Sequence, residues 1–596
     1  MTTSQKNEMA VRQKQRKEGE TEAVVRQKQH KEGEMEAAVR EERRKEVGTE
    51  AAEHILGPNP VVGLRGKDLF QTFGMLARQV LRQPHQVLAH GFTFAAEATR
   101  ILGGASELAP DPKDRRFQDP TWKENELYRR GLQLYLSANK EVQDWVDASI
   151  PDSDDRRRAH FVLSLFTDAL APSNSPLNPE ALKRFLETGG ESAVRGLRHL
   201  IDDLRYNGGM PSQVDKSAFK VGENLATTAG AVVFRNEVLE LIHYQPTTKK
   251  VSECPLLVVP PQINKFYIFD LSPKKSVTQY LLSNGVQVFT ISWRNPTPAQ
   301  RTWGLDTYVG AIEEAIDVVR DITGNPDCNL AGACAGGMTT IALVGHLAAR
   351  RERKVNAVTL LVSAFDTGND PSILGLFATE EAIEAARRRS HTQGVLEGKE
   401  MERIFAWLRP NDLVWNYWVN NYLLGNEPPT FDVLYWNSDS TRLPATFHSE
   451  LLTLYQQNPL PVAGKLTVRG TPIDIAQVDC DFYTIAGVTD HIAPWEACYR
   501  SSLLLGKREF ILSNSGHIQS ILNPPSNPKA TFFTNTERPA DAQIWLAGAT
   551  KNPGSWWEHW KAWLLARSGL QKVAPTSLGN STYQPLVEAP GTYVYE

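Results

Sequence analysis

The sequence lacks the features that mark secreted, membrane-spanning or nucleic-acid-binding proteins. Its 596 residues include only 5 cysteines and no CxxC pair, which is too few for a disulfide framework or a cysteine zinc site. The 65 Lys and Arg residues nearly balance the 69 Asp and Glu residues, so no net charge favours a nucleic acid or an anionic membrane. The first thirty residues are charged throughout and lack the apolar run of a secretory signal. These absences predict a cytoplasmic protein.

One uncharged stretch, residues 328–349, is long enough to cross a membrane. We reject that interpretation because four glycines interrupt the stretch and Asn329, Thr339, Thr340 and His346 make it more polar. A strand, a tight turn and a buried helix explain the pattern better. No transmembrane segment is expected.

Residues 1–50 have no aromatic side chain, and 12 Lys or Arg and 11 Asp or Glu make up nearly half of them. A 14-residue repeat places Val11, Val25 and Val39 at equivalent positions. One apolar residue in two heptads is too little for a stable coiled coil. The composition therefore predicts a solvated helix or disorder, with a partner-binding helix as the alternative.

The pattern of apolar residues changes along the rest of the chain. Apolar residues at helical spacing come first, and short apolar runs that alternate with helical stretches follow, which is typical of an α/β fold with a parallel sheet covered on both faces. An aromatic-rich block then interrupts the alternation and is predicted to cap the sheet; a small domain with its own aromatic core is the alternative. The predicted parts are a helical domain at 51–225, a core at 226–365, the cap insertion at 366–461 and the rest of the core at 462–596.

The motif Gly-Ala-Cys-Ala-Gly at 332–336 lies between a predicted strand and a predicted helix. This is the context of a nucleophile elbow, in which two glycines permit a strained turn and the helix N-terminus favours a thiolate. The motif alone is weak, since a small thiol in a glycine-rich turn would look the same. Cys334 is the candidate nucleophile.

Two later loops supply the groups that such a nucleophile needs. α/β-hydrolases place the acid and then the histidine after successive late strands. Here, Asp490 follows a predicted strand at 482–486 and His517 follows one at 509–512. Asp479 and Asp481 precede their strand and would lie at the wrong edge of the sheet. His491 is interpreted as structural, so the predicted triad is Cys334, Asp490 and His517.

The predicted oxyanion hole uses two backbone N–H groups. One belongs to Ala335, directly after the nucleophile. The other comes from the loop at 260–264, where two prolines offer no N–H and leave Gln262, Ile263 or Asn264; Ile263 is preferred.

A cysteine is both a good attacking group and a good leaving group, so the triad favours acyl transfer from a thioester to a hydroxyl. An aromatic cap that excludes water would favour transfer over hydrolysis. A Cys-dependent α/β-hydrolase or thioesterase and a non-enzymatic interaction protein are the alternatives.

Several longer motifs stand out in the sequence: GACAGG at 332–337, PPQINKFY at 260–267, ISWRNP at 291–296, SGHIQSILNPP at 515–525, and RPNDLVW with NYWVNNY at 409–422. Together they resemble the polyhydroxyalkanoate synthases, in particular the single-subunit type of pseudomonads that uses medium-chain (R)-3-hydroxyacyl-CoA. The likeness covers residues from about 55 to 596, and residues 1–50 are an extension without a counterpart.

The resemblance implies that Cys334 is acylated, that His517 is the general base and that Asp490 orients or assists it. It also implies that CoA is released, that a polyester grows, and that the enzyme is an acyltransferase at the surface of cytoplasmic polyhydroxyalkanoate granules. A homodimer and granule-associated proteins are the implied partners. No metal and no cofactor are expected, since the CoA thioester is a substrate.

Overall fold

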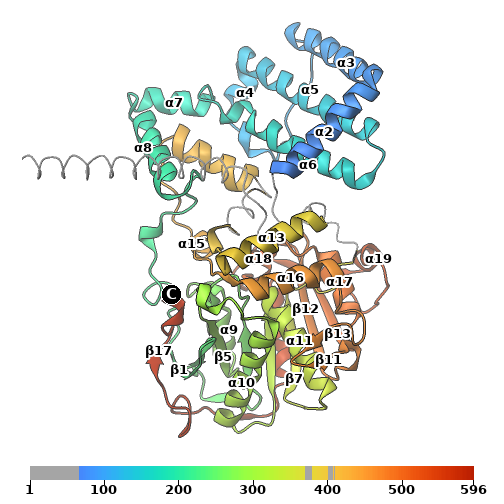
Figure 1. Ribbon diagram of the computed structural model, residues 1–596. Helices are drawn as coiled ribbons and strands as arrows, with labels where there is room; N and C mark the ends of the chain where they lie inside the picture. The colour runs from blue at the N-terminus through green and yellow to red at the C-terminus, as the bar shows by residue number, and fades with distance from the viewer. Residues whose placement is uncertain (1–65, 369–378, 401–406, 408–409, 491) are drawn as a thin grey trace, which may run out of the picture. The chain divides into compact units, whose positions relative to one another are not determined.

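The protein is described from a computed structural model that covers residues 66–368, 379–400, 407, 410–490 and 492–596 (Figure 1). The repeat predicted within residues 1–50 and His491 lie outside these residues. The chain divides into two compact units, residues 1–56 with 201–210 and residues 57–200 with 211–596. The second unit holds the sheet and the candidate site. Within the described residues, no helix has the length and apolar character to cross a membrane.

The first described part of the chain is helical, as predicted. Its helices begin at side chains that satisfy free backbone N–H groups, as when Asn125 accepts from Leu127 and Tyr128 at the start of α5 and Asp152 caps α6. Small apolar clusters hold the helices together; one joins Leu76 and Val146. The helices are α2 (Gly66–Arg82), α3 (Pro84–Leu102), α4 (Thr121–Glu124), α5 (Glu126–Ser149), α6 (Ser153–Ala169), α7 (Pro179–Glu187) and α8 (Glu191–Tyr206).

The rest of the second unit is built on an 11-stranded mixed sheet in the order β15-β14-β13-β12-β7-β6-β4-β5-β2-β1-β17. The six strands from β13 to β5 are mutually parallel, and the flanking strands are antiparallel. The strands are β1 (Gly230–Arg235), β2 (Leu239–Tyr244), β4 (Leu256–Val259), β5 (Val288–Trp293), β6 (Cys328–Ala333), β7 (Val355–Leu361), β12 (Asp481–Gly487), β13 (Lys507–Ser513), β14 (Thr531–Thr534), β15 (Thr550–Pro553) and β17 (Val587–Glu588).

Alternate residues of the central strands enter two separate cores, one on each face of the sheet. In β4, Leu257 and Val259 pack with α10 (Leu305–Thr323) and α11 (Ala335–Ala349). Leu256 and Val258 pack with α9 (Val277–Ser283) and α20 (Trp556–Leu565). Each such side chain contributes about 1.5–3 kcal/mol by leaving water. This double burial explains why the strands are continuous apolar runs, as the sequence predicted.

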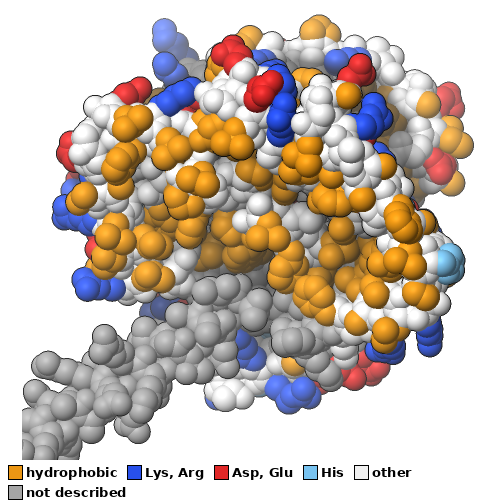
Figure 2. Space-filling view, turned by 90° about the horizontal axis from the view of Figure 1, so that it is seen from above, with side chains coloured by type: hydrophobic (Ala, Val, Ile, Leu, Met, Phe, Trp, Pro, Cys, Tyr) orange, Lys and Arg blue, Asp and Glu red, His pale blue; other side chains and the backbone are white. Residues whose placement is uncertain are grey.

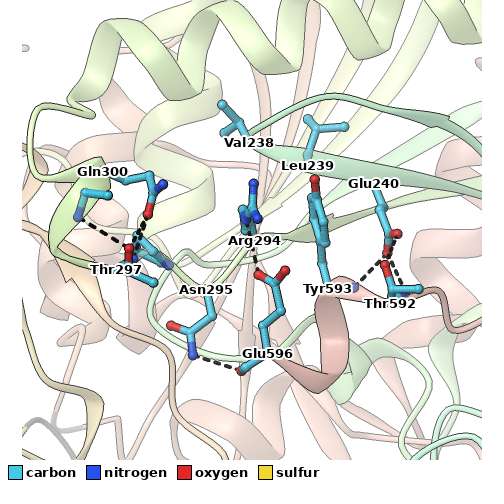
Figure 3. Close-up of polar contacts among 12 residues, drawn as sticks. Val238, Leu239, Glu240, Arg294, Asn295, Thr297, Gln300, Thr592, Tyr593 and Glu596 are labelled. Carbon is cyan, nitrogen blue, oxygen red and sulfur yellow. Dashed lines mark hydrogen bonds and ion pairs between the residues drawn. The ribbon is translucent and has the colours of Figure 1, made fainter.

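The C-terminal segment closes the edge of the sheet. β17 pairs with β1, and the short helix η9 (Tyr593–Tyr595) follows it. The buried Glu240 accepts hydrogen bonds from the amides of Thr592 and Tyr593, while Asn295 donates to the carbonyl oxygen of Glu596 at 2.9 Å (Figure 3). The antiparallel edges were not predicted, because their strands carry no βαβ pattern.

The block between β7 and β12 covers the sheet and shares its core. Phe447 packs against Tyr308 of α10 with ring centroids 4.6 Å apart and ring planes tilted by 51°, and Leu443 and Leu454 join the same cluster. The block contains more helix than its irregular sequence suggested. The helices left no clear periodic pattern in the sequence because they are short or carry few apolar residues. Its described elements are α13 (Glu380–Gln393), β8 (Val395–Leu396), the π-helices η6 (Asn411–Trp415) and η7 (Trp418–Leu423), α15 (Asp432–Ser438), β9 (Leu443–Pro444), α16 (Ala445–Gln457), β10 (Thr467–Val468), β11 (Thr471–Pro472) and η8 (Ile475–Gln477).

The stretch at 328–349 forms a strand, a turn and a helix, as predicted. β6 occupies its first six residues and α11 its last fifteen, and only Cys334 stands between them. The described part of the chain therefore places this residue at a strand-to-helix junction in the middle of the sheet.

Candidate active site

Cys334 occupies a strained turn between β6 and α11. Its φ of 48° and ψ of −120° are unfavourable for a side chain with a Cβ and cost about 1–3 kcal/mol. The turn is tight because the neighbouring glycines touch other backbone: a Cβ at Gly336 would lie 2.4 Å from the carbonyl oxygen of Val259. This turn places the partly exposed thiol of Cys334 at the N-terminus of α11.

Asp490 and His517 lie on the loops that follow β12 and β13, at the carboxyl ends of two neighbouring parallel strands. His517 Nδ1 and Asp490 Oδ2 are 2.7 Å apart, and both side chains are buried. The other carboxylate oxygen accepts hydrogen bonds from the amides of Ile492 and Ala493 at 2.8 and 2.9 Å. Asp490 is thereby held in one orientation, and it in turn holds the imidazole.

The imidazole of His517 retains its proton strongly. Burial lowers the pKa of His517, but the Asp490 carboxylate and Cys334 more than offset this and raise that pKa from 6.5 to about 10. A protonated imidazole beside Cys334 is the kind of positive charge that activates a cysteine nucleophile.

The other four thiols are unsuited to this role. They are buried, and burial raises the pKa of each of them. For Cys480, burial together with Asp481 and Asp479 raises the pKa to about 12. Cys334 is the cysteine that combines exposure with a neighbouring base.

The competing carboxylates lie at the opposite end of β12. Asp481 begins that strand and pairs with Arg567 at 2.7 Å, and Asp479 pairs with Lys507 at 3.4 Å. Both are therefore surface ion pairs at the amino edge of the parallel strands, as their place in the sequence predicted.

The two predicted oxyanion donors belong to residues close to Cys334. Ala335 is the first residue of α11, where a backbone N–H has no partner within the helix. Ile263 belongs to the loop after β4 and lines the same cavity as Cys334. Within the described residues, no acceptor contacts the N–H of Ile263.

A mainly apolar cavity of about 180 Å³ opens onto Cys334 and His517. The covering block supplies Leu413, Val433 and Trp436 to its wall, and the helix that begins at His517 supplies Ile518 and Ile521. These wall residues were not predicted individually, although the concentration of aromatics in the block was a signal. The described residues contain no group of three or more His, Cys, Asp or Glu side chains that could hold a metal ion.

Two family models and several known proteins match the chain. The family described as "Poly-beta-hydroxybutyrate polymerase (PhaC) N-terminus" matches residues 113–281, and the α/β hydrolase fold matches residues 255–524. Poly(3-hydroxyalkanoate) polymerase 1 of Ectopseudomonas oleovorans is 57% identical over 92% of this chain and 98% of its own length. The chain belongs to the poly(3-hydroxyalkanoate) polymerases.

The chain is also similar to a more distant polymerase and to solved structures of other proteins. The poly(3-hydroxyalkanoate) polymerase subunit of Cupriavidus necator is 42% identical over 84% of this chain and 86% of its own length. A soluble variant of the Saccharomyces cerevisiae monoglyceride lipase shares 10% identity at a TM-score of 0.36, covering 59% of this chain and 99% of its own. As a poly(3-hydroxyalkanoate) polymerase the chain is an acyltransferase with an α/β-hydrolase fold, and both predictions are confirmed.

Proposed function

We propose that this polymerase uses medium-chain (R)-3-hydroxyacyl-CoA and transfers each acyl group to a growing polyester through a Cys334 acyl-enzyme, with release of CoA. The observation that supports this most is the strained, half-exposed Cys334 beside the buried pair of His517 and Asp490. The apolar cavity at the thiol suits an alkyl chain, and the resemblance to pseudomonad synthases supports the chain length.

In the first step, His517 takes the thiol proton and the sulfur of Cys334 attacks the thioester carbonyl carbon. The electron pair of the C=O bond moves to the oxygen, where the N–H groups of Ala335 and Ile263 stabilise the negative charge. The C–S bond to CoA then breaks, and the CoA thiolate takes the proton from the imidazolium. The products are the acyl-enzyme and free CoA.

In the second step, the hydroxyl end of the growing chain attacks the acyl-enzyme. His517 accepts the hydroxyl proton as the new C–O ester bond forms; the C–S bond between the acyl carbon and Cys334 then breaks, and His517 returns the proton to the sulfur. Asp490 keeps the imidazole oriented throughout. The apolar side chains over the cavity keep water from competing with the hydroxyl.

A Cys-dependent thioesterase would share the first step and differ only in the acceptor. Incubation of the purified protein with a series of (R)-3-hydroxyacyl-CoA thioesters separates the two functions when both released CoA and polymer mass are followed. We expect polymer, with the highest rates for medium chains. Free hydroxy acid equal to the CoA released would support the thioesterase instead, and no CoA release would support a non-enzymatic role.

We also propose that the enzyme works at the surface of cytoplasmic polyester granules as a homodimer, with granule-associated proteins as neighbours. Figure 2 shows hydrophobic side chains gathered across the face seen from above. In α7 and α8 the exposed apolar side chains include Leu186, which is 77% exposed, and Val194, which is 69% exposed. Such an accumulation favours contact with an apolar surface. Recovery of the enzyme with isolated granules, and its loss in Leu186→Glu with Val194→Glu, would test this.

A further inference from the structure

The direction of the proposed oxyanion donor, the N–H of Ile263, is set by the peptide group that joins Gln262 and Ile263. The N–H of Ile263 and the carbonyl of Gln262 belong to the same peptide, which is trans. In a planar trans peptide the C=O and the N–H point in opposite directions. Any group that holds the carbonyl of Gln262 on one side therefore directs the N–H of Ile263 to the other side.

Thr441 holds that carbonyl. Its hydroxyl donates to the carbonyl oxygen of Gln262 at 2.6 Å, and its amide donates to the carbonyl oxygen of Ile263 at 3.2 Å. Thr441 is buried and lies two residues before β9, in the block that covers the sheet. Gln262 is buried as well, whereas Ile263 lines the cavity at Cys334. The carbonyl thus faces Thr441, and the N–H of Ile263 points away from Thr441.

The same loop is tied to the second oxyanion donor. The side-chain amide of Gln262 donates to the hydroxyl of Thr339 at 3.0 Å, and that hydroxyl donates to the carbonyl oxygen of Ala335 at 2.9 Å. Trp293 fixes the start of the loop by donating to the carbonyl oxygen of Pro260 at 2.8 Å. A buried chain of hydrogen bonds therefore runs from Thr441 through Gln262 and Thr339 to Ala335.

We propose that Thr441 is a positioning residue for the oxyanion hole, which directs the N–H of Ile263 at the carbonyl oxygen of the bound thioester. This inference rests on the proposed acyl-enzyme mechanism. The covering block then does more than exclude water, because it orients one of the two groups that stabilise the tetrahedral intermediate. Thr441 touches neither the substrate nor the reacting atoms.

The test replaces Thr441 by Val, which removes the hydroxyl and keeps the shape, and by Ser, which keeps the hydroxyl. In Thr441→Val, we expect kcat for CoA release to fall about tenfold with KM nearly unchanged, because the donor remains but is misdirected. Thr441→Ser should stay within about twofold of the wild type. Thr484→Val is the matched control, since Thr484 is buried on β12 and its hydroxyl has no hydrogen-bond partner among the described residues.

A second measurement separates positioning from a structural role. Alkylation of Cys334 by iodoacetamide forms no oxyanion, whereas acylation by a hydroxyacyl-CoA does. Thr441→Val should therefore react with iodoacetamide at the wild-type rate and with the thioester about tenfold more slowly.

Three results would overturn the proposal: wild-type acylation in Thr441→Val, an equal fall in alkylation and acylation, or a tenfold loss in Thr441→Ser, which is informative even if the Val variant does not fold. Failure of the acyl-enzyme mechanism itself has a different signature. In that case Cys334→Ala would retain polymerisation, whatever Thr441→Val does.

Discussion

Replacing Asp490 by Asn would change one atom of the candidate triad and preserve its shape. The oxygen that accepts from the amides of Ile492 and Ala493 can remain in place, so the new NH2 group would face Nδ1 of His517. Nδ1 would then have to accept a hydrogen bond, which puts the ring proton on Nε2. A ring in that tautomer cannot take the proton of Cys334.

The size of the effect follows from the proton affinity of the imidazole. Against the opposing effect of burial, Asp490 and Cys334 raise the pKa of His517 from 6.5 to about 10. At about 1.36 kcal/mol for each pKa unit, this is on the order of 5 kcal/mol, shared between the two partners. The Asn variant loses the carboxylate's share of this free energy, so we expect it to be slower by up to about 10³-fold.

The assay is a single-turnover measurement of CoA release by chromatography, followed by measurement of polymer growth under excess substrate. Because Asp490 holds the imidazole before any substrate binds, we expect both the first equivalent of CoA and the later elongation to slow together. Asp481→Asn is the matched control, because Asp481 lies at the other end of β12 and this change removes its ion pair with Arg567. Its rates should equal those of the wild type.

The reasoning would be refuted by a first equivalent of CoA released at the wild-type rate, followed by slow elongation. Asp490 would then serve mainly to activate the acceptor hydroxyl through His517. Rates within about twofold of the wild type in both phases would show that the carboxylate contributes neither proton affinity nor orientation.

The same variant has a pH signature in stability. The folded-state pKa of His517 is raised from 6.5 to about 10, so the stabilisation is fully present below pH 6.5 and is lost as the pH rises through 10. The difference in Tm between the wild type and Asp490→Asn should therefore be largest near pH 6 and become small by about pH 10. Calorimetry across this range checks the sign, and a difference that grows with pH would contradict it.

The remaining predictions concern the nucleophile, the base, the other thiols and the N-terminal extension. Cys334→Ala should abolish polymer formation and keep the far-UV circular dichroism spectrum, and Cys334→Ser should retain little activity, since a hydroxyl is far less acidic than a thiol of pKa about 8.5. His517→Ala should lose acylation itself, measured as the absence of a first equivalent of CoA. Single replacement of Cys328 or Cys480 by Ala should cost about 1–2 kcal/mol in unfolding free energy and leave acylation intact, and lost acylation would identify a different nucleophile. Deletion of residues 1–50 should leave specific activity and Tm nearly unchanged, and a large drop would show that this segment supports the catalytic unit.

The sequence by itself determined the order of the central elements and the identity of the candidate triad. Runs such as Leu256–Val259 can be predicted as strands because a strand buried on both faces must be apolar at every position. The strand-to-helix turn at Cys334 can be predicted from the sequence because such a strained turn needs glycines at fixed neighbouring positions. Asp490 and His517 follow from chain order, since the carboxyl ends of parallel strands meet at one edge of the sheet.

Only the tertiary structure decided which residues support that triad. Trp436 in the cavity wall and Thr441 behind the oxyanion loop come from a block whose irregular pattern predicts no orientation. Their contacts join residues more than 170 positions apart, as between Thr441 and Gln262, and no local periodicity encodes such a pairing. The antiparallel pairing of β17 with β1 could not be predicted from local sequence either, because its register depends on where the C-terminal segment meets Glu240 and Asn295. Local patterns specify elements, and the packing of distant segments specifies the geometry of the site.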